Sequence, residues 1–579
     1  MNKYLLGTLF LAASLFAVQP AEAGIFSFLH KKKTEKKAPQ KTSYEKILTD
    51  QPVTTAAGPL LTLHKADGKL YIELPKATLG KDFLLGVTLS SVSNASLGTV
   101  GFRNSNPVHF RFVRKDSVVV MDLVNTDFLL PSPNAAVQRS AKDNYTNLSF
   151  LSFPVKGWSK DSASVLIDAS SFFLKDNKFF PVIGDDMNGL SVNTNLDDDL
   201  THIKTLKSFK TNASVTVERS YSADIRSERG TVASDYPITI GVNYTLMALP
   251  EHPMVPRLSD TRIGLFLTNK YIFDNDKRIE NTTFVRRWRV EPADTAAYMA
   301  GKLVAPKKHI VYYVDPGFPD LWKQAIRVGV LRWNKAFERI GFKDVIQVRD
   351  YPTAKEDPQF DPDNLEYSCL RYVPTAVENA MGPSWSDPRT GEIINGSVYV
   401  YRGVASVLNS WRFIQTSQVD STVRTKKMPD EAMRKSLEYV IAHEIGHTLG
   451  FMHNMAASFA YPVDSLRSKT PTDSLRSATF TRQYGTTPSI MDYARHNYVA
   501  QPGDPVTNLD PPALGIYDYY IIDWTYRAFP ELKGDYIAEN KKLRDLIESH
   551  AGDPLYRYGL QQDQPVRDPS AVSPYQHLS

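Results

Sequence analysis

The residues best suited to chemistry lie in one short stretch, from His443 to His453. It reads His-Glu-Ile-Gly-His-Thr-Leu-Gly-Phe-Met-His and combines three imidazoles with one carboxylate. His443 and His447 are four residues apart, which on a helix places both rings on one face, one turn apart. Two imidazole nitrogens in that position can bind one Zn²⁺ ion at about 2.0–2.1 Å. Glu444 lies beside them, where a carboxylate can accept a proton from metal-activated water.

The third histidine, His453, can join the other two only if the chain leaves the helix after His447. On a continued helix it would lie about 9 Å further along the axis, at 1.5 Å per residue. Gly450 stands between the two histidines, and glycine adopts positive φ angles without steric cost and commonly ends helices. The spacing therefore predicts a helix that ends near Gly450 and a turn that brings His453 back to the zinc.

The alternative interpretation is an ordinary amphipathic helix with surface histidines. Only 12 histidines occur among the 579 residues, and five motif positions are filled at fixed offsets. Short motifs do give false positives, but a chance match of this length is rare in such a composition. We therefore predict a zinc site formed by His443, His447 and His453, with Glu444 as the general base.

The motif resembles that of the metzincins, zinc endopeptidases with the pattern H-E-x-x-H-x-x-G-x-x-H and a methionine-containing turn downstream. The segment Ser-Ile-Met-Asp-Tyr at 489–493 fits this turn. The resemblance implies that Met491 lies beneath the zinc and that Tyr493 binds the metal or stabilises the oxyanion. Asn454 follows the third histidine, a residue that assigns the chain to none of the best-known metzincin branches.

Two functions of different class are compatible with these residues. The first is a secreted zinc-dependent endopeptidase, in which Glu444 takes a proton from zinc-activated water and later gives it to the leaving amine. The second is a non-catalytic, β-rich binding protein with a purely structural zinc. A closed structural site needs a fourth protein ligand, for which Tyr493 is the candidate, and it has no use for Glu444. The endopeptidase is therefore our prediction.

The elements that would position these residues follow one another along the chain. A short apolar strand at 309–315 precedes an amphipathic helix at 321–340, whose apolar residues recur at three- and four-residue steps. Further strands are expected at 367–373 and 393–401. The zinc helix is expected from Asp430, as its cap, to Leu449. This order is that of a metzincin N-terminal subdomain.

Substrate is expected to add itself as an extended strand at an exposed sheet edge. The segment 397–401 (Ser-Val-Tyr-Val-Tyr) is the candidate edge, because it lies about 40 residues before the zinc helix. No specificity pocket can be read from 455–490, where the residues show no interpretable pattern.

The region from 46 to 300 is predicted to be β-rich. Alternating apolar runs at 60–64 and 70–74 flank Asp67-Gly68, and similar runs at 108–113 and 117–122 flank a Lys-Asp turn. Further strands are expected at 165–168, 214–218 and 237–246. A layered or barrel-like antiparallel assembly is the expected result.

The first residues are typical of a secretory signal peptide. Lys3 is followed by an apolar stretch of about 15 residues and by Ala21-Glu-Ala23, a small-x-small cleavage site. A membrane anchor is the alternative, but a spanning helix needs roughly 20 apolar residues. No cysteine follows the site, which argues against lipid attachment. We predict a secreted or periplasmic protein with no membrane span after signal removal.

Composition is that of an ordinary globular protein, with 42% hydrophobic and 23% charged residues. The formal net charge is +5, much of it in the lysine-rich segment after the signal peptide, and gives no reason to expect nucleic-acid binding. Cys369 is the single cysteine, so no intrachain disulfide forms. It could cap the zinc as a cysteine switch, but a small buried hydrophobe is the expected role.

Several runs outside the zinc motif carry a wider resemblance. They are Leu63–Tyr71, Met254–Gly264, Arg287–Pro292, Gly382–Glu392 and Ser489–Arg495. Together they resemble large secreted or periplasmic bacterial zinc-dependent metalloproteases, which carry N-terminal domains of uncharacterised role before a metzincin catalytic domain. The match covers nearly the whole mature chain and implies a protein or peptide substrate.

The predicted fold is therefore α+β, with a β-rich N-terminal region and a metzincin-like α/β catalytic domain that contains a mixed sheet. The expected parts are a signal peptide (1–23), a basic linker (24–45), the β-rich region (46–300), the protease domain (301–530) and a C-terminal helix with a flexible tail (531–579). The β-rich region is either an inhibitory pro-region or an attached binding module. We favour the module, because 286–304 shows no linker-like break.

Overall fold

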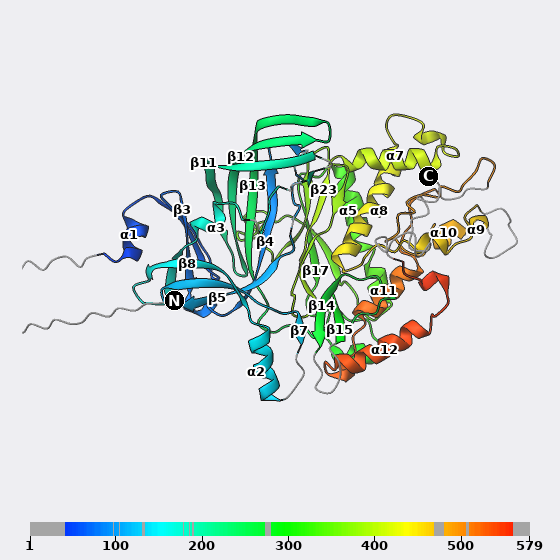
Figure 1. Cartoon of the computed structure of the whole chain (residues 1–579). Helices are drawn as coiled ribbons and strands as arrows, with labels where there is room; N and C mark the ends of the chain where they lie inside the picture. The colour runs from blue at the N-terminus through cyan, green and yellow to red at the C-terminus, as the bar shows by residue number, and fades with distance from the viewer. Residues whose placement is uncertain are drawn as a thin grey trace, which may run out of the picture. The chain divides into compact units, whose positions relative to one another are not determined.

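A computed structural model describes residues 41–95, 98–103, 105–129, 134–177, 179–183, 186–187, 190–272, 280–467, 480–504 and 509–559. The expected signal peptide and the basic segment up to residue 40 lie outside the described residues. From Ser43 on, the chain forms one unit by its internal contacts. It combines a β-rich N-terminal region with a C-terminal region in which most of the helices lie (Figure 1).

One large antiparallel sheet makes up most of the N-terminal region. Its order is β1-β2-β3-β9-β8-β6-β5-β4-β13-β12-β11-β10. The strands are β1 (Val53–Ala57), β2 (Thr62–Ala66), β3 (Lys69–Pro75), β4 (Asp82–Val92), β5 (Val108–Lys115), β6 (Val118–Leu123), β8 (Leu148–Trp158), β9 (Ser164–Asp168), β10 (Asp186–Met187), β11 (Leu190–Ser208), β12 (Asn212–Ser227) and β13 (Gly230–Ala248).

The two hairpins predicted from the sequence, β2–β3 and β5–β6, are present, and each turns at the predicted turn residues. Asp67 and Gly68 join β2 to β3 with φ angles of 49° and 70°, and positive φ at both central residues is what a type I′ hairpin turn requires. The turn between β5 and β6 likewise contains Asp116 at φ 50°. Register follows from the period of two, because it places the alternate apolar residues of each strand on the same buried face.

The large sheet curls until its first strands lie against β11. Lys65 on β2 donates a hydrogen bond to the carbonyl of Ile203 (2.8 Å), and the hydroxyl of Ser208 donates to the carbonyl of Leu61 (2.7 Å). The concave face encloses an apolar core that includes Phe83, Phe110, Phe112, Phe153, Val217 and Val242. This core gives the N-terminal region its own source of stability.

A second sheet lies in the C-terminal region, in the order β18-β17-β19-β23-β20. Its strands are β17 (Ile310–Val314), β18 (Ile346–Asp350), β19 (Ser368–Val373), β20 (Ala380–Met381) and β23 (Val398–Tyr401). Strands β18, β17, β19 and β23 run parallel to one another, and β20 runs antiparallel to β23. Our prediction of 397–401 as the free edge is wrong, because β23 is flanked on both sides and β20 forms the edge.

Helices surround this sheet, and α5 and α8 pack against each other (Figure 1). The α-helices are α1 (Ser43–Thr49), α2 (Ala135–Asn144), α3 (Ser170–Phe173), α4 (Thr295–Met299), α5 (Asp320–Leu331), α6 (Asn334–Glu338), α7 (Val404–Thr416), α8 (Asp430–Thr448), α9 (Val463–Arg467), α10 (Phe480–Tyr484), α11 (Ile516–Tyr526) and α12 (Tyr536–Glu548). The zinc helix α8 matches the prediction, although Pro429 rather than Asp430 occupies the N-cap position.

The amphipathic helix predicted at 321–340 is broken into α5 and α6. The indole of Trp333 donates to the carbonyl of Ala442 (2.9 Å), and the side chain of Asn334 bonds both backbone groups of Ile346 (2.9 Å each). At the break the backbone bonds change to the 3₁₀ type, as from the N–H of Ala336 to the carbonyl of Trp333 (2.9 Å). The side-chain bonds hold Trp333 against the zinc helix and Asn334 against β18.

Two small sheets connect the regions. One has the order β15-β14-β7 and contains β7 (Phe128–Leu129), β14 (Leu267–Ile272) and β15 (Glu280–Val285). The other has the order β16-β22-β21 and contains β16 (Arg287–Trp288), β21 (Ser384–Ser386) and β22 (Glu392–Gly396). Buried residues before position 300, including Ile263, Leu265, Val285 and Trp288, belong to the same core as the catalytic sheet.

The large sheet also packs directly on the C-terminal region. Trp385 forms a buried cluster with Leu84, Met247 and Leu249. The approach is close, because a Cβ atom on Gly86 would lie 2.3 Å from the Trp385 ring. Among the described residues, no helix is long and apolar enough to cross a membrane.

Candidate metal centre and active-site cleft

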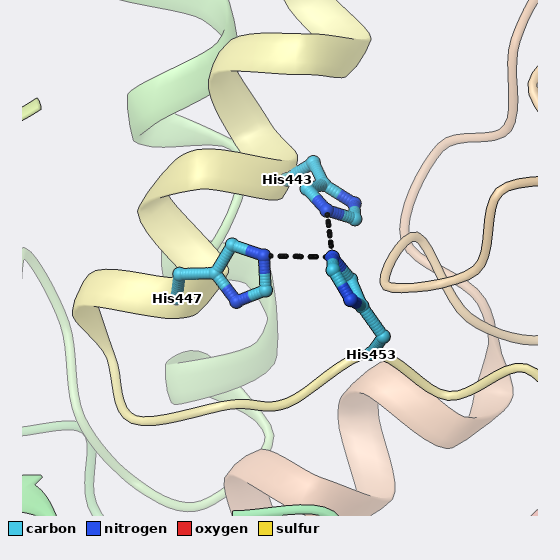
Figure 2. Close-up of side chains that lie close together, drawn as sticks. All are labelled: His443, His447 and His453. Atoms are coloured by element: carbon cyan, nitrogen blue, oxygen red, sulfur yellow. Dashed lines mark hydrogen bonds between the residues drawn. The ribbon is translucent and has the colours of Figure 1, made fainter. Parts of the chain in front are cut away.

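Three imidazole rings converge at the C-terminal end of α8. His443 and His447 lie one turn apart on this helix, and His453 lies on the segment that follows (Figure 2). The Nε2 atom of His453 is 3.2 Å from Nε2 of His443 and 3.1 Å from Nε2 of His447. Within the described ranges, this is the one group of His, Cys, Asp or Glu side chains with metal-binding spacing.

The spacing of the nitrogens fits a zinc ion. Tetrahedral ligands at about 2.0–2.1 Å from zinc lie about 3.3 Å from one another, close to the observed 3.1 and 3.2 Å. Nδ1 of His443 donates to the carbonyl of Ile490 (2.9 Å), and Nδ1 of His447 donates to the carbonyl of Phe451 (2.7 Å). Since a carbonyl only accepts, both protons are on Nδ1 and both Nε2 lone pairs are free for a metal.

Burial keeps the three rings neutral. It lowers the pKa of His443 well below the usual value, with a further contribution from the neighbouring histidines. Burial also lowers the pKa of His447 to about 4 and that of His453 to about 3. A neutral imidazole is the form that binds metal, so this environment favours a metal over protons at neutral pH.

The turn that returns His453 to the site depends on Gly450. Its φ is 99°, and a Cβ atom there would lie 2.1 Å from the carbonyl oxygen of Arg286. The carbonyl of Gly450 accepts from the backbone N–H of Phe266 (2.8 Å). Gly450 therefore ends the helix as predicted, and a segment almost 200 residues earlier in the chain holds the turn in place.

The methionine turn lies against the zinc helix. A Cβ atom on Gly446 would lie 2.3 Å from the sulfur of Met491, which is buried. The backbone carbonyl of Met491 accepts from the N–H of Asn454 (3.0 Å). The preceding carbonyl, of Ile490, accepts from the ring of His443. The methionine turn is therefore bonded to the ligand His443 and to Asn454, the residue that follows the ligand His453.

Asp518 on α11 anchors the methionine turn. Its carboxylate accepts from the hydroxyl of Ser489 (2.8 Å) and from the backbone N–H groups of Ile490 (2.8 Å) and Gly515 (2.7 Å). Asn454 is held in a similar way by the carbonyl of Arg557 and the N–H of Gly559. The aromatic helix α11 is therefore a buried support for the site.

Glu444 is buried beside the histidines, with 8% of its surface exposed. Burial raises the pKa of its carboxyl to about 8, against a smaller lowering by the backbone N–H of Gly382. That N–H lies directly after the edge strand β20. The edge of the sheet therefore orients the carboxylate that was predicted to be the general base.

Tyr493 lies on the other side of the histidines. Its ring centroid is 4.5 Å from that of His453 and 5.7 Å from that of His443. Burial raises the pKa of its phenol to about 12, with a further rise from the charge of Glu444. The hydroxyl is therefore protonated at neutral pH and can donate a hydrogen bond.

These groups line one cleft of about 620 Å³. Its walls include the three histidines, Glu444, Tyr493 and the edge strand β20. A further wall comes from the loop between β4 and β5, with Gly101, Phe102, Arg103, Ser105 and Asn106. The N-terminal region therefore contributes directly to the cleft.

The three predicted zinc ligands, Glu444 and Tyr493 all line this cleft, whereas Met491 and Cys369 do not. Cys369 is buried, and its thiol lies 3.8 Å from the carbonyl of Tyr367. Within the segment 455–490, from which no specificity pocket could be predicted, residues 468–479 lie outside the described residues. Sequence reasoning missed the roles of Phe266, Gly382 and Arg103, because no spacing rule connects them with the histidines. Gly382 does begin one of the runs that carried the family resemblance.

Comparison with known families agrees with this geometry. Residues 425–576 match a family model described as Met-zincin. Residues 103–293 and 41–92 match two models that are each described as a domain of unknown function (DUF5117 and DUF5118). No curated protein and no solved structure matches the chain. The predicted metzincin resemblance is confirmed: the match at residues 425–576 supports a zinc metallopeptidase, and together with the three-histidine cluster it implies zinc as the metal.

Proposed function

We propose that this protein is a secreted zinc-dependent endopeptidase that cleaves proteins or peptides. The observation that supports it best is the convergence of three histidine Nε2 atoms at metal-binding spacing beside a buried carboxylate in an open cleft. Three protein ligands leave one coordination position for water or substrate, as in catalytic zinc sites.

Zinc held by His443, His447 and His453 supplies Lewis-acid activation of water and of the substrate carbonyl. Glu444 accepts the proton of the attacking water and then gives it to the leaving amine. Burial raises the pKa of this carboxyl, and the positive charge of a bound zinc would lower it again toward neutral pH, where the group can both accept and release a proton. The protonated phenol of Tyr493 donates a hydrogen bond to the carbonyl oxygen as negative charge develops there.

Substrate would bind along the free edge of β20, which lines the cleft. Its backbone would pair with Ala380 and Met381 and extend that sheet by one strand. The unpaired edge and the adjacent Gly382, whose N–H holds Glu444, support this position. A complex with a peptide inhibitor paired with any other segment would refute it.

A purely structural zinc is the competing function. It requires a fourth protein ligand. Among the described His, Cys, Asp and Glu side chains, three histidines alone form the cluster, and the remaining candidate, Tyr493, has a phenol pKa raised to about 12 that keeps it protonated, whereas a metal ligand must be deprotonated. A structural site also gains nothing from a buried carboxylate at Glu444, which costs free energy to ionise. Both observations favour catalysis.

The decisive experiment compares the parent protein with Glu444→Gln on casein and on a quenched peptide, with and without a chelator. We expect chelator-sensitive hydrolysis that falls at least about 100-fold in the variant, because the amide accepts no proton. Zinc content should stay at one ion per chain in both proteins. Glu338→Gln on α6, an exposed residue, is the matched control and should keep full activity. Turnover of Glu444→Gln within a few-fold of the parent would rule out the general-base role.

A further inference from the structure

A second, smaller cavity opens beside the zinc cleft. Its volume is about 250 Å³, and it shares Arg103, Asn106, Phe266, Gly382 and Pro383 with the main cleft. The ring of Phe266 lies 5.9 Å from that of His447. A peptide paired with β20 would therefore pass this cavity within a few residues of the zinc.

Two arginines from different parts of the chain line the smaller cavity. Arg103 comes from the β4–β5 loop, and Arg286 lies between β15 and β16. The Nη2 group of Arg103 donates to the carbonyl of Ser384 (2.9 Å), and its guanidinium lies 5.0 Å from the Trp385 ring centroid. The Nη1 group of Arg103 is buried without a hydrogen-bond partner.

Arg286 is in a similar situation. Its backbone N–H is bonded to the carbonyl of Phe266 (2.8 Å), while its side-chain Nε is buried without a partner. Among the described residues, neither guanidinium forms an ion pair, and no Asp or Glu lines this cavity. Most other buried arginines do have a carboxylate, as Arg389 has Asp387 and Arg412 has Asp420.

Both arginines are expected to carry charge at neutral pH. Burial lowers the pKa of Arg103 to about 10, with a smaller lowering by the charge of Arg286 and an opposing rise from Tyr399. Burial also lowers the pKa of Arg286. Two positive charges that line one cavity without a carboxylate partner are costly unless an anion joins them.

The remaining lining favours a small planar anion. Pro107, Pro383 and Pro388 form rigid apolar walls, which strengthen an ion pair by excluding water. Hydroxyl groups of Thr268, Ser384 and Ser386 add possible donors. Guanidinium groups bind carboxylates through paired N–H donors, and a carboxylate is the anion that a peptide substrate carries.

We propose that Arg103 and Arg286 form a subsite that binds a carboxylate of the peptide substrate next to the scissile bond. This inference rests on the proposed peptidase function. The carboxylate is either that of an Asp or Glu side chain or that of the peptide C-terminus. The subsite exists only when the N-terminal region is in place, because Arg103 and Arg286 both belong to that region.

Binding to the inactive Glu444→Gln protein tests the subsite without turnover. Fluorescent peptides that differ only in Glu versus Gln at successive positions form one arm, and free-acid versus amidated C-termini form the other. Two to three charge-assisted hydrogen bonds should make one charged peptide bind about 10- to 100-fold more tightly than its neutral partner. Tighter binding of a Glu peptide in the first arm supports a side-chain carboxylate, and tighter binding of the free-acid peptide in the second arm supports the C-terminal carboxylate. Equal affinity for both members of every pair would overturn the proposal, with no mutation of the subsite needed.

Variants of the subsite then locate the interaction. Arg103→Met and Arg286→Met in the Glu444→Gln protein should remove the preference while binding of the neutral peptide changes little. Arg229→Met, an exposed arginine in the turn between β12 and β13 of the same region, is the matched control and should keep the preference. A preference that survives both subsite variants in folded protein would place the carboxylate elsewhere and refute the assignment.

Hydrolysis by the parent protein separates this proposal from the proposed function. Cleavage of peptides without any preference for a carboxylate would leave the peptidase function standing and sink the subsite. Preferential binding of the charged peptide by Glu444→Gln, with no cleavage of any peptide by the parent, would support the subsite and refute the peptidase.

Discussion

Replacing Gly446 by alanine tests whether the methionine turn positions the zinc ligands. A Cβ atom at this position would lie 2.3 Å from the sulfur of Met491 and 3.0 Å from the Trp333 ring. Ordinary contact begins near 3.4 Å, so the sulfur must move by about 1.1 Å. Trp333 is held by its bond to the carbonyl of Ala442 and leaves little room for that movement. Overpacking of this kind costs about 1–3 kcal/mol.

Two opposing terms decide the net effect on stability. Alanine gains about 1 kcal/mol over glycine inside a helix, so Gly446→Ala alone should destabilise the protein by roughly 0–2 kcal/mol. In a Met491→Ala background the clash with the sulfur is absent and the 3.0 Å contact with Trp333 remains. The same substitution should then stabilise by up to about 1 kcal/mol, less whatever that contact costs. The sign of the effect should therefore change with the residue at 491.

The methionine turn also holds the ligands, through Ile490 to His443 and through Met491 to Asn454. Loss of such supporting bonds typically weakens metal affinity about 10- to 100-fold. The assays are a chelator competition for zinc and thermal unfolding of all four proteins, with and without zinc. Additive effects of the two substitutions, or unchanged zinc affinity in Gly446→Ala, would refute the proposed coupling.

Three further predictions follow from the same geometry. His447→Ala should lose most bound zinc, and full zinc occupancy by metal analysis would contradict the three-histidine site. Asp82→Asn should lower the unfolding free energy by about 1.5–3 kcal/mol at neutral pH. Burial alone would raise the pKa of Asp82. Hydrogen bonds from His109 and Arg111 outweigh burial and hold that pKa well below its usual range. Since a depressed carboxyl pKa stabilises the fold above the unfolded value of about 3.9, the difference between parent and variant should persist above about pH 5 and shrink as pH falls below 4 in urea titrations. The fragment 301–579 should be insoluble, or unfolded when measured by circular dichroism, because it lacks Val285 and Trp288 of the catalytic core. A soluble fragment more active than 24–579 would instead make the N-terminal region inhibitory.

The parts of the fold that could be predicted are those with a local physical signal. The period of two and the Asp67-Gly68 turn specify a hairpin within 14 residues, and Gly450 ends the zinc helix because its positive φ permits no other residue. The zinc site follows from such local rules, because its three ligands lie within 11 residues. Short-range sterics decide all of these features.

The parts that could not be predicted depend on contacts between distant segments. The edge strand β20 has two residues and no periodicity, whereas the alternating run at 398–401 looks like an edge and is internal. At the break after α5, Trp333 bonds the carbonyl of Ala442 on α8, a contact that the apolar period of 321–340 does not indicate. Arg103 reaches the cleft from 340 positions before His443, and no pattern in either segment indicates the other.

The structure bears on whether the N-terminal region could be removed to activate the enzyme. Arg389, from the C-terminal region, bonds Asp82 on β4 (3.0 Å) and the carbonyl of Pro250 (2.7 Å). The hydroxyl of Tyr401 donates to the carbonyl of Val100 (2.5 Å), next to the loop that walls the cleft. Removal of the region would expose the apolar cluster around Trp385 and leave the Arg389 guanidinium without its Asp82 partner. A pro-region that is cleaved off should cover the zinc and leave an intact core behind, whereas here the histidines face an open cleft. The N-terminal region is therefore better explained as a permanent wall of the substrate cleft.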